Sequence, residues 1–394
     1  MKYGTYAKGI ATGVVLTLLA GGGVRVVQSY HSGELLSDTT FRQKISYLEN
    51  IIDNEYLGEI STDDLKEGVY SGLIYGLGDV YSRYYTKAQY EQEAAATEGS
   101  YVGIGVSMQK YTAGGVQVVE CYKGSTAEEA GIKADDVITA INGEDITDAE
   151  LNDVVSIIKS NEDKDITLTV QRQDEDTQEI TVKVSSVELP SVFGEMLNSN
   201  TGYIQITEFK GVTTEQYEEA FAELKDQGME RLIVDLRDNP GGYLSSVCDI
   251  LRKILPEGLI VYTEDKNGNR SEETCDGKNP LNMPLAVLVN GNSASASEIF
   301  AGAVKDYKIG TIVGTTTYGK GVVQSLRQLS DGSAVKLTVA NYYTPEGNSI
   351  NKTGIQPDVE VELDPELINK TEISHDEDNQ LEEALKILDE KIEW

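Results

Sequence analysis

Two short, strongly apolar runs constrain the fold more than any other feature of this sequence. The runs are RLIVDLR at residues 231–237 and LAVLVN at residues 285–290, and each is followed by a Gly- or Ser-rich turn and then by a helical pattern. Apolar residues at successive positions are typical of strands buried on both faces of a parallel sheet. We therefore predict an α/β domain over residues 187–365. In such domains, sites usually form in the loops that follow the carboxyl ends of the strands.

Three other regions show different patterns. Residues 31–95 repeat apolar side chains at three- and four-residue steps, for example Phe41 and Ile45, which predicts a helical cap or a dimerisation segment. Residues 96–186 form short alternating runs around one helical stretch, which predicts a compact β-rich module. Residues 366–394 predict an acidic, helical C-terminal tail. The expected class is a multidomain α/β (α+β) protein.

The N-terminus carries an uncharged apolar stretch. Residues 9–24 lie between Lys8 and Arg25, and with the valines that follow they are long enough to cross a hydrocarbon core of about 30 Å. Lysines precede the stretch and acidic residues follow it, so the positive-inside rule keeps the N-terminus in the cytoplasm. We expect residues 1–30 to be a cytoplasmic start and a transmembrane signal anchor of a single-pass protein of the cell membrane. The alternative is a cleaved signal peptide and a secreted protein. Both make the rest of the chain extracytoplasmic.

Composition excludes several classes of function. Lys and Arg number 33 and Asp and Glu number 66, so the net charge is −33. Such a chain repels a phosphate backbone, which excludes nucleic-acid binding as the main function. His31 lies just past the apolar N-terminal stretch and His375 lies in the acidic tail, which leaves no core histidine for a Ser-His-Asp triad or an HExxH zinc site. The three cysteines are widely separated and predict neither a zinc ribbon nor a disulfide framework.

Two loops of the α/β domain carry candidate chemistry. The loop DLRDNPGG, residues 235–242, contains Gly241 and Gly242, which permit a backbone that exposes N–H groups to an oxyanion. A tight strand-to-helix turn would favour the same residues. The loop NGNSASASEIF, residues 290–300, places a hydroxyl at a helix start, where simple N-capping by Ser293 is the other interpretation.

A lysine between two predicted strands is a candidate base. With no histidine available, a serine nucleophile would need Lys, Asp or Glu to accept its proton. Lys320 lies in an apolar, Gly-flanked setting. To act near neutral pH its pKa must fall by about 3 units, which burial can cause because desolvation disfavours the ammonium ion. A surface lysine beside a turn is the alternative interpretation.

Together, these loops and this lysine resemble the C-terminal processing peptidases (tail-specific proteases), which are serine endopeptidases with a Ser-Lys dyad. The segments DLRDNPGG, SASASEIFAGAVKDY, GTTTYGKGVVQ and YYTPEGNSINKTGIQPD occur in the family's order and spacing, and the resemblance covers nearly the whole chain. It implies that Ser295 is the nucleophile and Lys320 the base. Spacing alone does not choose Ser295 over the neighbouring serines. The resemblance also implies that Gln324 orients the lysine. It implies further that the backbone N–H groups of Gly241 and Ala296 form the oxyanion hole.

The module at residues 96–186 resembles a PDZ domain. YVGIGVSM matches its carboxylate-binding loop, and GSTAEEAGIKADDVITAINGEDI matches the strand-turn-strand signature of bacterial versions. Successive backbone N–H groups can hold a C-terminal carboxylate there. The residues implied are Gly103, Ile104, Gly105 and Val106. One departure precedes the module: GLGDVYSRYY stands where many relatives have LDPYS, which concerns the geometry of the cap and leaves the catalytic loops untouched.

The resulting hypothesis is a membrane-anchored, extracytoplasmic serine endopeptidase whose PDZ domain binds substrate C-termini. It requires no metal and no organic cofactor, and its partners are proteins or peptides with free C-termini. A homodimer formed through the terminal helices is a further hypothesis, compatible with catalysis. The rival from another class is a PDZ-bearing scaffold with an inert protease core, and the intact Ser295, Lys320 and Gln324 argue against it.

Overall fold

The computed structural model describes residues 34–390 apart from 173–175, 369 and 371–372. The predicted signal anchor at residues 1–30 lies outside the described residues. In the part of the chain that is described, no helix has the length and apolar character needed to cross a membrane.

The chain divides into two units, residues 1–69 and residues 70–394. The described part of the first unit is helical, as predicted, with α2 (Glu34–Ser37), α3 (Thr39–Glu55) and most of α4 (Thr62–Tyr75). Asp38 caps α3, because its carboxylate accepts a hydrogen bond from the Thr40 N–H at 2.8 Å.

The second unit contains a small antiparallel sheet with its own core. Its strands run in the order β3-β4-β5-β7-β8, with the short strand β6 (Glu144–Asp145) paired to β5. The bounds are β3 (Val106–Lys110), β4 (Val116–Cys121), β5 (Val137–Ile141), β7 (Asp165–Gln171) and β8 (Gln178–Lys183). The helices α6 (Thr126–Glu129) and α7 (Leu151–Lys159) contribute Ala127, Val154 and Ile158 to this core. The strands β2 (Ser100–Gly103) and β9 (Ser185–Glu188) pair with each other at the two ends of the module.

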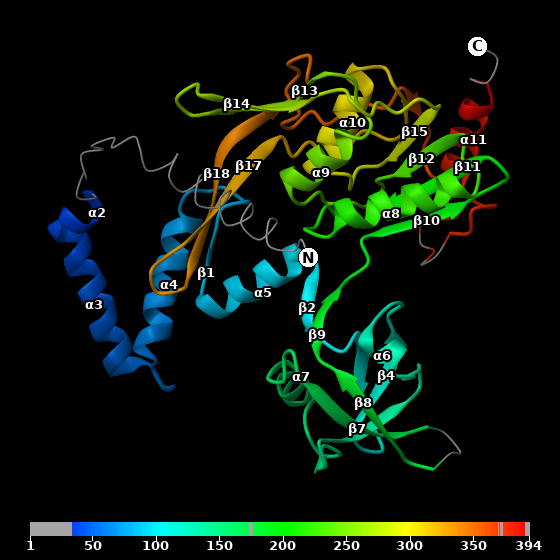
Figure 1. Ribbon diagram of the computed structural model, residues 1–394. Helices are drawn as coiled ribbons and strands as arrows, with labels where there is room; N and C mark the ends of the chain where they lie inside the picture. The colour runs from blue at the N-terminus through cyan, green and yellow to red at the C-terminus, as the bar shows by residue number, and fades with distance from the viewer. Residues whose placement is uncertain (1–33, 173–175, 369, 371–372, 391–394) are drawn as a thin grey trace, which may run out of the picture. The chain divides into compact units, whose positions relative to one another are not determined.

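A six-stranded sheet forms the centre of the α/β domain (Figure 1). Its order is β10-β11-β12-β15-β16-β19, and every neighbouring pair is parallel except the β10-β11 edge. The bounds are β10 (Val192–Met196), β11 (Thr201–Ile206), β12 (Arg231–Asp235), β15 (Leu285–Val289), β16 (Thr311–Gly314) and β19 (Val359–Glu360). All residues of β12 and β15 are buried, which confirms the prediction from their apolar runs.

Helices cover both faces of this sheet. Leu232 and Val234 of β12 pack in the larger core with α8 (Thr213–Asp226), α9 (Leu244–Leu251) and α10 (Ala296–Asp306). Ile233, which points to the opposite face, packs with α11 (Asn379–Glu390) through Leu381 and Leu388. The C-terminal helix is therefore part of the core of the domain, because its apolar stripe closes the second face of the sheet.

A second, antiparallel sheet has the strand order β1-β18-β13-β14, with β17 also paired to β18. Its bounds are β1 (Arg83–Tyr85), β13 (Gly258–Asp265), β14 (Arg270–Cys275), β17 (Val322–Gln328) and β18 (Ala334–Tyr343). The strand β1 falls within the segment predicted to be a helical cap, and the helix α5 (Lys87–Glu98) follows it. The three residues of β1 form a strand because they pair with β18, which lies far along the chain.

Candidate active site

Three loops meet at the carboxyl edge of the parallel sheet. They follow β12, β15 and β16, which are adjacent strands, so the loops emerge side by side. The loops are residues 236–243, 290–295 and 315–321. Gly241, Ser295 and Lys320 each lie on one of them. The fold thus brings together the segments from which the sequence predicted the chemistry.

Ser295 immediately precedes α10 in a strained conformation. Its φ is 55° and its ψ is −111°, a region that residues other than glycine rarely adopt. Such a conformation costs about 1–3 kcal/mol and persists only where the surroundings enforce it. The side chain is 8% exposed. A strained serine on a sharp strand-to-helix turn is a geometry that suits a nucleophile.

The structure distinguishes Ser295 from its two neighbouring serines. The Ser293 hydroxyl donates to the Leu236 carbonyl at 2.7 Å, and the Ser297 hydroxyl donates to the Asn239 carbonyl at 3.0 Å. Both hydroxyls therefore hold the segment of residues 293–297 against the loop after β12. Within the described residues, the Ser295 hydroxyl donates no such bond. This gives a physical reason for the choice of Ser295, which spacing alone could not make.

Glu298 joins the loop of Ser295 (residues 290–295) to the loop of Lys320 (residues 315–321). Its Oε2 accepts hydrogen bonds from the backbone N–H groups of Ser295 and Lys320, both at 2.8 Å. Its Oε1 accepts the Gly319 N–H at 2.7 Å and the Thr317 hydroxyl at 2.6 Å. Burial raises the pKa of the Glu298 carboxyl, and the four donors oppose that rise because they favour the ionised form. One buried carboxylate thus fixes the backbone of both members of the predicted dyad.

Sequence reasoning missed this role of Glu298. The residue lies in the first turn of α10, where an acidic side chain is expected because it interacts favourably with the helix dipole. That ordinary explanation gave no reason to look further. Its complete burial is the distinguishing signal, and burial is visible only in the fold.

Lys320 is half-buried in the third loop. Its Nζ lies 5.0 Å from the centroid of the Tyr81 ring. Burial lowers the pKa of Lys320, the positive charge of Lys336 lowers it further, and the charge of Glu298 acts in the opposite direction. The direction of this shift is the one that a general base needs.

Gly241 packs directly against Ser295 and Ala296. A Cβ at Gly241 would lie 2.8 Å from the Ser295 Cβ and 2.9 Å from the Ala296 nitrogen, so no larger residue fits. Its φ of +106° also requires glycine. Ala296 is the first residue of α10, and the N–H groups of a first helical turn have no partner within the helix. The two predicted oxyanion donors are therefore adjacent.

The Gly241 N–H is engaged within the protein. It donates to the Asn239 side-chain oxygen at 2.8 Å, and the Asn239 amide nitrogen in turn donates to the Ile206 carbonyl at 2.8 Å. Asn239 is fully buried. The expectation that this glycine turn exposes its N–H groups is therefore wrong for Gly241, whose N–H already has an acceptor inside the protein.

Gln324 lies on β17, four residues beyond Lys320. Its side-chain nitrogen donates to the Val322 carbonyl at 3.3 Å and to the Thr338 hydroxyl at 3.4 Å. Among the residues that the structure describes, it has no recorded hydrogen bond with Lys320. Its role in orienting the lysine stays a prediction.

A buried ion-pair network anchors the loop that follows β12. The Arg237 guanidinium contacts the carboxylates of Asp235 and Asp378 at 2.6 and 2.7 Å. Burial acts against the charge of Arg237, but the two carboxylates raise its pKa. Asp378 accepts the N–H groups of the first turn of α11. Arg237 thus ties the start of the C-terminal helix to the loop that carries Gly241.

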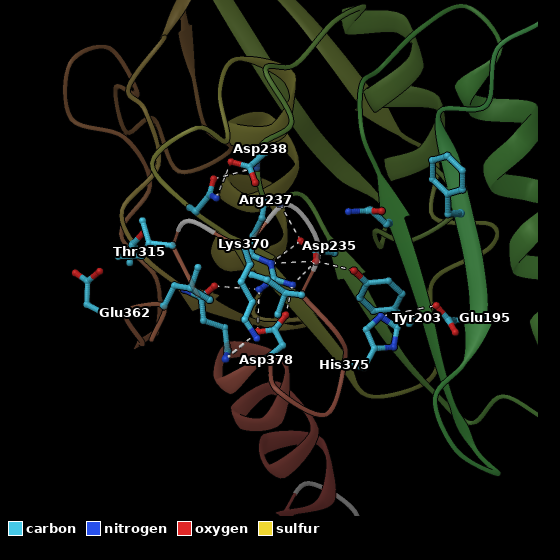
Figure 2. Close-up of a pocket in the computed structure, with 17 residues that line it drawn as sticks. Glu195, Tyr203, Asp235, Arg237, Asp238, Thr315, Glu362, Lys370, His375 and Asp378 are labelled. Carbon is cyan, nitrogen blue, oxygen red and sulfur yellow. Dashed lines mark hydrogen bonds and ion pairs between the residues drawn. The ribbon is translucent and has the colours of Figure 1, made fainter. Parts of the chain in front are cut away.

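A pocket of about 640 Å³ lies beside this network. Figure 2 shows Arg237 between the two aspartates, with the Tyr203 hydroxyl donating to Asp235 at 2.7 Å. His375 also lines the pocket, with its ring centroid 5.1 Å from that of Tyr203. The sequence had left His375 in an acidic tail. The His375 Nε2 also lies 3.7 Å from a carboxylate oxygen of Glu195.

The predicted carboxylate-binding loop connects β2 and β3. Gly103, Ile104, Gly105 and Val106 lie at or between the ends of these strands. The Ile104 carbonyl accepts the Ala127 N–H at 2.9 Å, which fixes the loop to α6. A groove of about 120 Å³ runs between β3 and α7 and is lined mainly by apolar side chains, including Met108 and Ile158. A groove between a strand edge and a helix is the geometry that binds an extended peptide.

Comparisons with known proteins agree with this architecture. The model of peptidase family S41 matches residues 200–361, and the model of the PDZ domain matches residues 117–172. A protein of Staphylococcus aureus (strain COL) named "Probable CtpA-like serine protease" is 34% identical over 334 residues, covering 84% of this chain and 67% of the relative. Its counterpart in the bovine strain RF122 is 35% identical over 329 residues, covering 83% of this chain and 66% of the relative.

A solved structure from Bacteroides fragilis, whose name assigns it to the S41 proteases, has the same fold. Its TM-score is 0.50 at 20% identity, and the match covers 88% of this chain and 97% of that structure. The chain spans about two thirds of the length of the staphylococcal relatives. The family and the PDZ module that the sequence predicted are confirmed. The chain belongs to the C-terminal processing peptidases, a family of serine-type, CtpA-like peptidases with a PDZ domain.

Proposed function

We propose that this chain is a membrane-anchored, extracytoplasmic serine endopeptidase that uses Ser295 as nucleophile and Lys320 as general base. The observation that carries the proposal is the shared carboxylate oxygen of Glu298, which holds the backbone N–H groups of both residues at 2.8 Å. The strained conformation of Ser295 and the lowered pKa of Lys320 support the same roles.

The reaction follows the chemistry of acyl transfer. Neutral Lys320 takes the hydroxyl proton as Ser295 Oγ forms a bond to the carbonyl carbon of the scissile peptide. The N–H groups of Gly241 and Ala296 donate to the resulting oxyanion, once Gly241 has left Asn239. The carbon–nitrogen bond then breaks, and the leaving amine takes the proton from the Lys320 ammonium. Water then attacks the ester while Lys320 takes one of its protons, and the bond from the carbonyl carbon to Ser295 Oγ breaks as Lys320 returns that proton to Oγ. Gln324 orients the lysine from β17.

The PDZ module selects the substrate. Its groove lies between β3 and α7, where an extended C-terminal segment adds to the strand edge and the N–H groups of the loop at Gly103–Val106 receive its carboxylate. Because the lining is mainly apolar and the groove holds only about 120 Å³, we infer that the last residue of the substrate is apolar.

The apolar stretch at residues 9–24 supports anchoring in the cell membrane, with the PDZ module and the protease core outside the cytoplasm. Secretion after signal cleavage is the alternative. The exposed apolar side chains of α3, such as Leu48, favour a homodimer through this helix.

The test is proteolysis of an unfolded protein by the full chain, measured beside the variants Ser295→Ala and Lys320→Ala. We expect activity only in the wild type. This activity falls as the pH drops through the lowered pKa of Lys320, because the protonated lysine cannot accept the serine proton. Lys278→Ala is the matched control, since its side chain is 76% exposed.

Equal activity in the wild type, Ser295→Ala and Lys320→Ala would refute the dyad. If the wild type itself is inactive, the assay is repeated with peptides that end in an apolar residue, because an enzyme closed at rest becomes active only when its PDZ groove is occupied. Continued inactivity would favour the scaffold.

A further inference from the structure

The segment of residues 79–85 reaches the neighbourhood of Lys320. Its last three residues form β1, which pairs with β18. The Ser82 hydroxyl accepts a hydrogen bond from the Thr338 N–H at 3.1 Å and donates to the Asp79 carboxylate at 2.5 Å. The Tyr81 N–H donates to the same carboxylate at 3.2 Å. The turn that carries Tyr81 is therefore fixed to β18 and closed on itself.

The Tyr81 ring is placed against the amine of Lys320. The Lys320 Nζ lies 5.0 Å from the ring centroid, within the distance at which an aromatic face attracts a cation. The Tyr81 side chain is half-buried, and its phenol interacts with that of Tyr318. This contact has no place in the dyad chemistry described above.

The charges around this contact come from several elements. The titratable groups recorded there, besides Lys320 itself, are Asp79, Tyr81, Glu298, Tyr318 and Lys336. Burial raises the pKa of Tyr81, and its interaction with Tyr318 raises it further, so the phenol stays neutral. The Glu298 carboxylate is directed at backbone N–H groups and the Thr317 hydroxyl. Tyr81 thus presents a neutral ring to the Lys320 amine.

We propose that Tyr81 is a positioning residue for the general base, whose ring holds the Lys320 Nζ and stabilises the ammonium ion formed when the lysine takes the serine proton. The inference rests on the proposed Ser-Lys dyad. A carboxylate in this position would stabilise the ammonium so strongly that the lysine would stay protonated near neutral pH. The attraction of a ring is weaker, so the lysine can both lose and regain its proton.

The test is the pH dependence of kcat/KM for the full chain, whose acid limb reports the pKa of the essential base. The variant Tyr81→Leu keeps an apolar side chain next to Lys320 but removes the aromatic ring. The ammonium is then less stable, and we expect the acid limb to move to lower pH by roughly one unit. Tyr81→Phe keeps the ring, so its acid limb stays at the wild-type position. Tyr81→Met is a second variant without a ring, should the leucine variant fail to fold.

Tyr262→Leu is the matched control. Its ring lies 3.6 Å from the Arg270 guanidinium carbon, so this variant removes a different cation–π contact. We expect its acid limb to stay at the wild-type position. The inference is overturned if the limb of the ring-less variants stays in place or moves to higher pH, or if Tyr81→Phe shifts as far as Tyr81→Leu. Activity in Lys320→Ala refutes the dyad itself. An inactive Lys320→Ala combined with an unshifted Tyr81→Leu refutes only the role of Tyr81.

Discussion

Each carboxylate oxygen of Glu298 accepts two hydrogen bonds, and this arrangement makes the residue intolerant of an amide. In Glu298→Gln an NH₂ group replaces one of these two oxygens, and an NH₂ group cannot accept a hydrogen bond. Whichever oxygen is replaced, the NH₂ group faces two groups that are themselves donors. At least one buried backbone N–H loses its acceptor. We expect the free energy of unfolding to fall by about 2–3 kcal/mol. Proteolysis should fall at least tenfold, because the backbones of Ser295 and Lys320 lose their common anchor.

Urea unfolding and a peptide-cleavage assay measure these two effects. The matched control is Glu230→Gln, which makes the same chemical change at an exposed position and should alter neither quantity. Wild-type stability in Glu298→Gln would mean that the carboxylate does not hold the two loops together.

The junction between α11 and the loop after β12 depends on the charge of Asp378. In Asp378→Asn the side chain can still cap the helix, because Asn and Asp are comparable N-caps. The buried Arg237 guanidinium, however, loses one of its two carboxylates. We expect the variant to be about 2–4 kcal/mol less stable than the wild type at pH 7.

The pH dependence of this difference has a definite sign. Burial alone would raise the pKa of Asp378, but Arg237 lowers it below the ordinary value of 3.8. The stability contributed by the ionised group is therefore complete at neutral pH and is lost only as the pH falls below 3.8. Urea unfolding at pH 7, 5 and 3 measures it, with the exposed Asp376→Asn as control. A difference that has already disappeared at pH 5 would contradict the assignment.

Elements with a local pattern could be predicted from the sequence, and elements defined by distant partners could not. The strands at residues 231–235 and 285–289 are apolar on both faces, so their burial in a parallel sheet follows from their composition. The strand β1 has only three residues, too few to show an alternation, and its pairing with β18 is set by tertiary structure. The amphipathic pattern of α11 predicted a helix, but the face it covers depends on the topology of the sheet.

The same distinction applies to the candidate site. The loops of Ser295, Gly241 and Lys320 are short motifs, and a family resemblance identified them. Glu298 and Tyr81 act through contacts with Lys320, which lies far from them in the chain. Asn239 acts through a local hydrogen bond to Gly241, which no rule of composition predicts. Their residue types are ordinary in their local positions, so only the fold could reveal them.

The net charge of −33 repels any substrate that approaches with a free carboxylate. Long-range repulsion opposes the encounter, while the backbone N–H groups of the PDZ loop favour the final contact. We expect a peptide with a C-terminal valine carboxylate to bind the Ser295→Ala variant at least tenfold more tightly than its amidated counterpart. Added salt should strengthen binding of the acid and leave the amide unchanged, because salt screens the repulsion.

Fluorescence anisotropy of labelled peptides measures both effects, and the Ser295→Ala variant prevents cleavage during the titration. The amidated peptide is the control for binding through the side chains alone. Equal affinities for the two peptides would show that the loop at Gly103–Val106 does not receive the carboxylate.

The hydrogen bond from Gly241 to Asn239 has a consequence for inhibitor chemistry. In the proposed mechanism, a small electrophile such as a boronic acid forms its tetrahedral adduct on Ser295, and the oxygen of the adduct can accept the Gly241 N–H only after that donor leaves Asn239. Its inhibition would develop slowly, at the rate at which the loop gives up its internal acceptor. A longer peptidic compound gains binding energy elsewhere on the protein, which can drive the same exchange. Potent inhibitors of this enzyme are therefore expected to be extended molecules, and reactive fragments alone would be poor starting points.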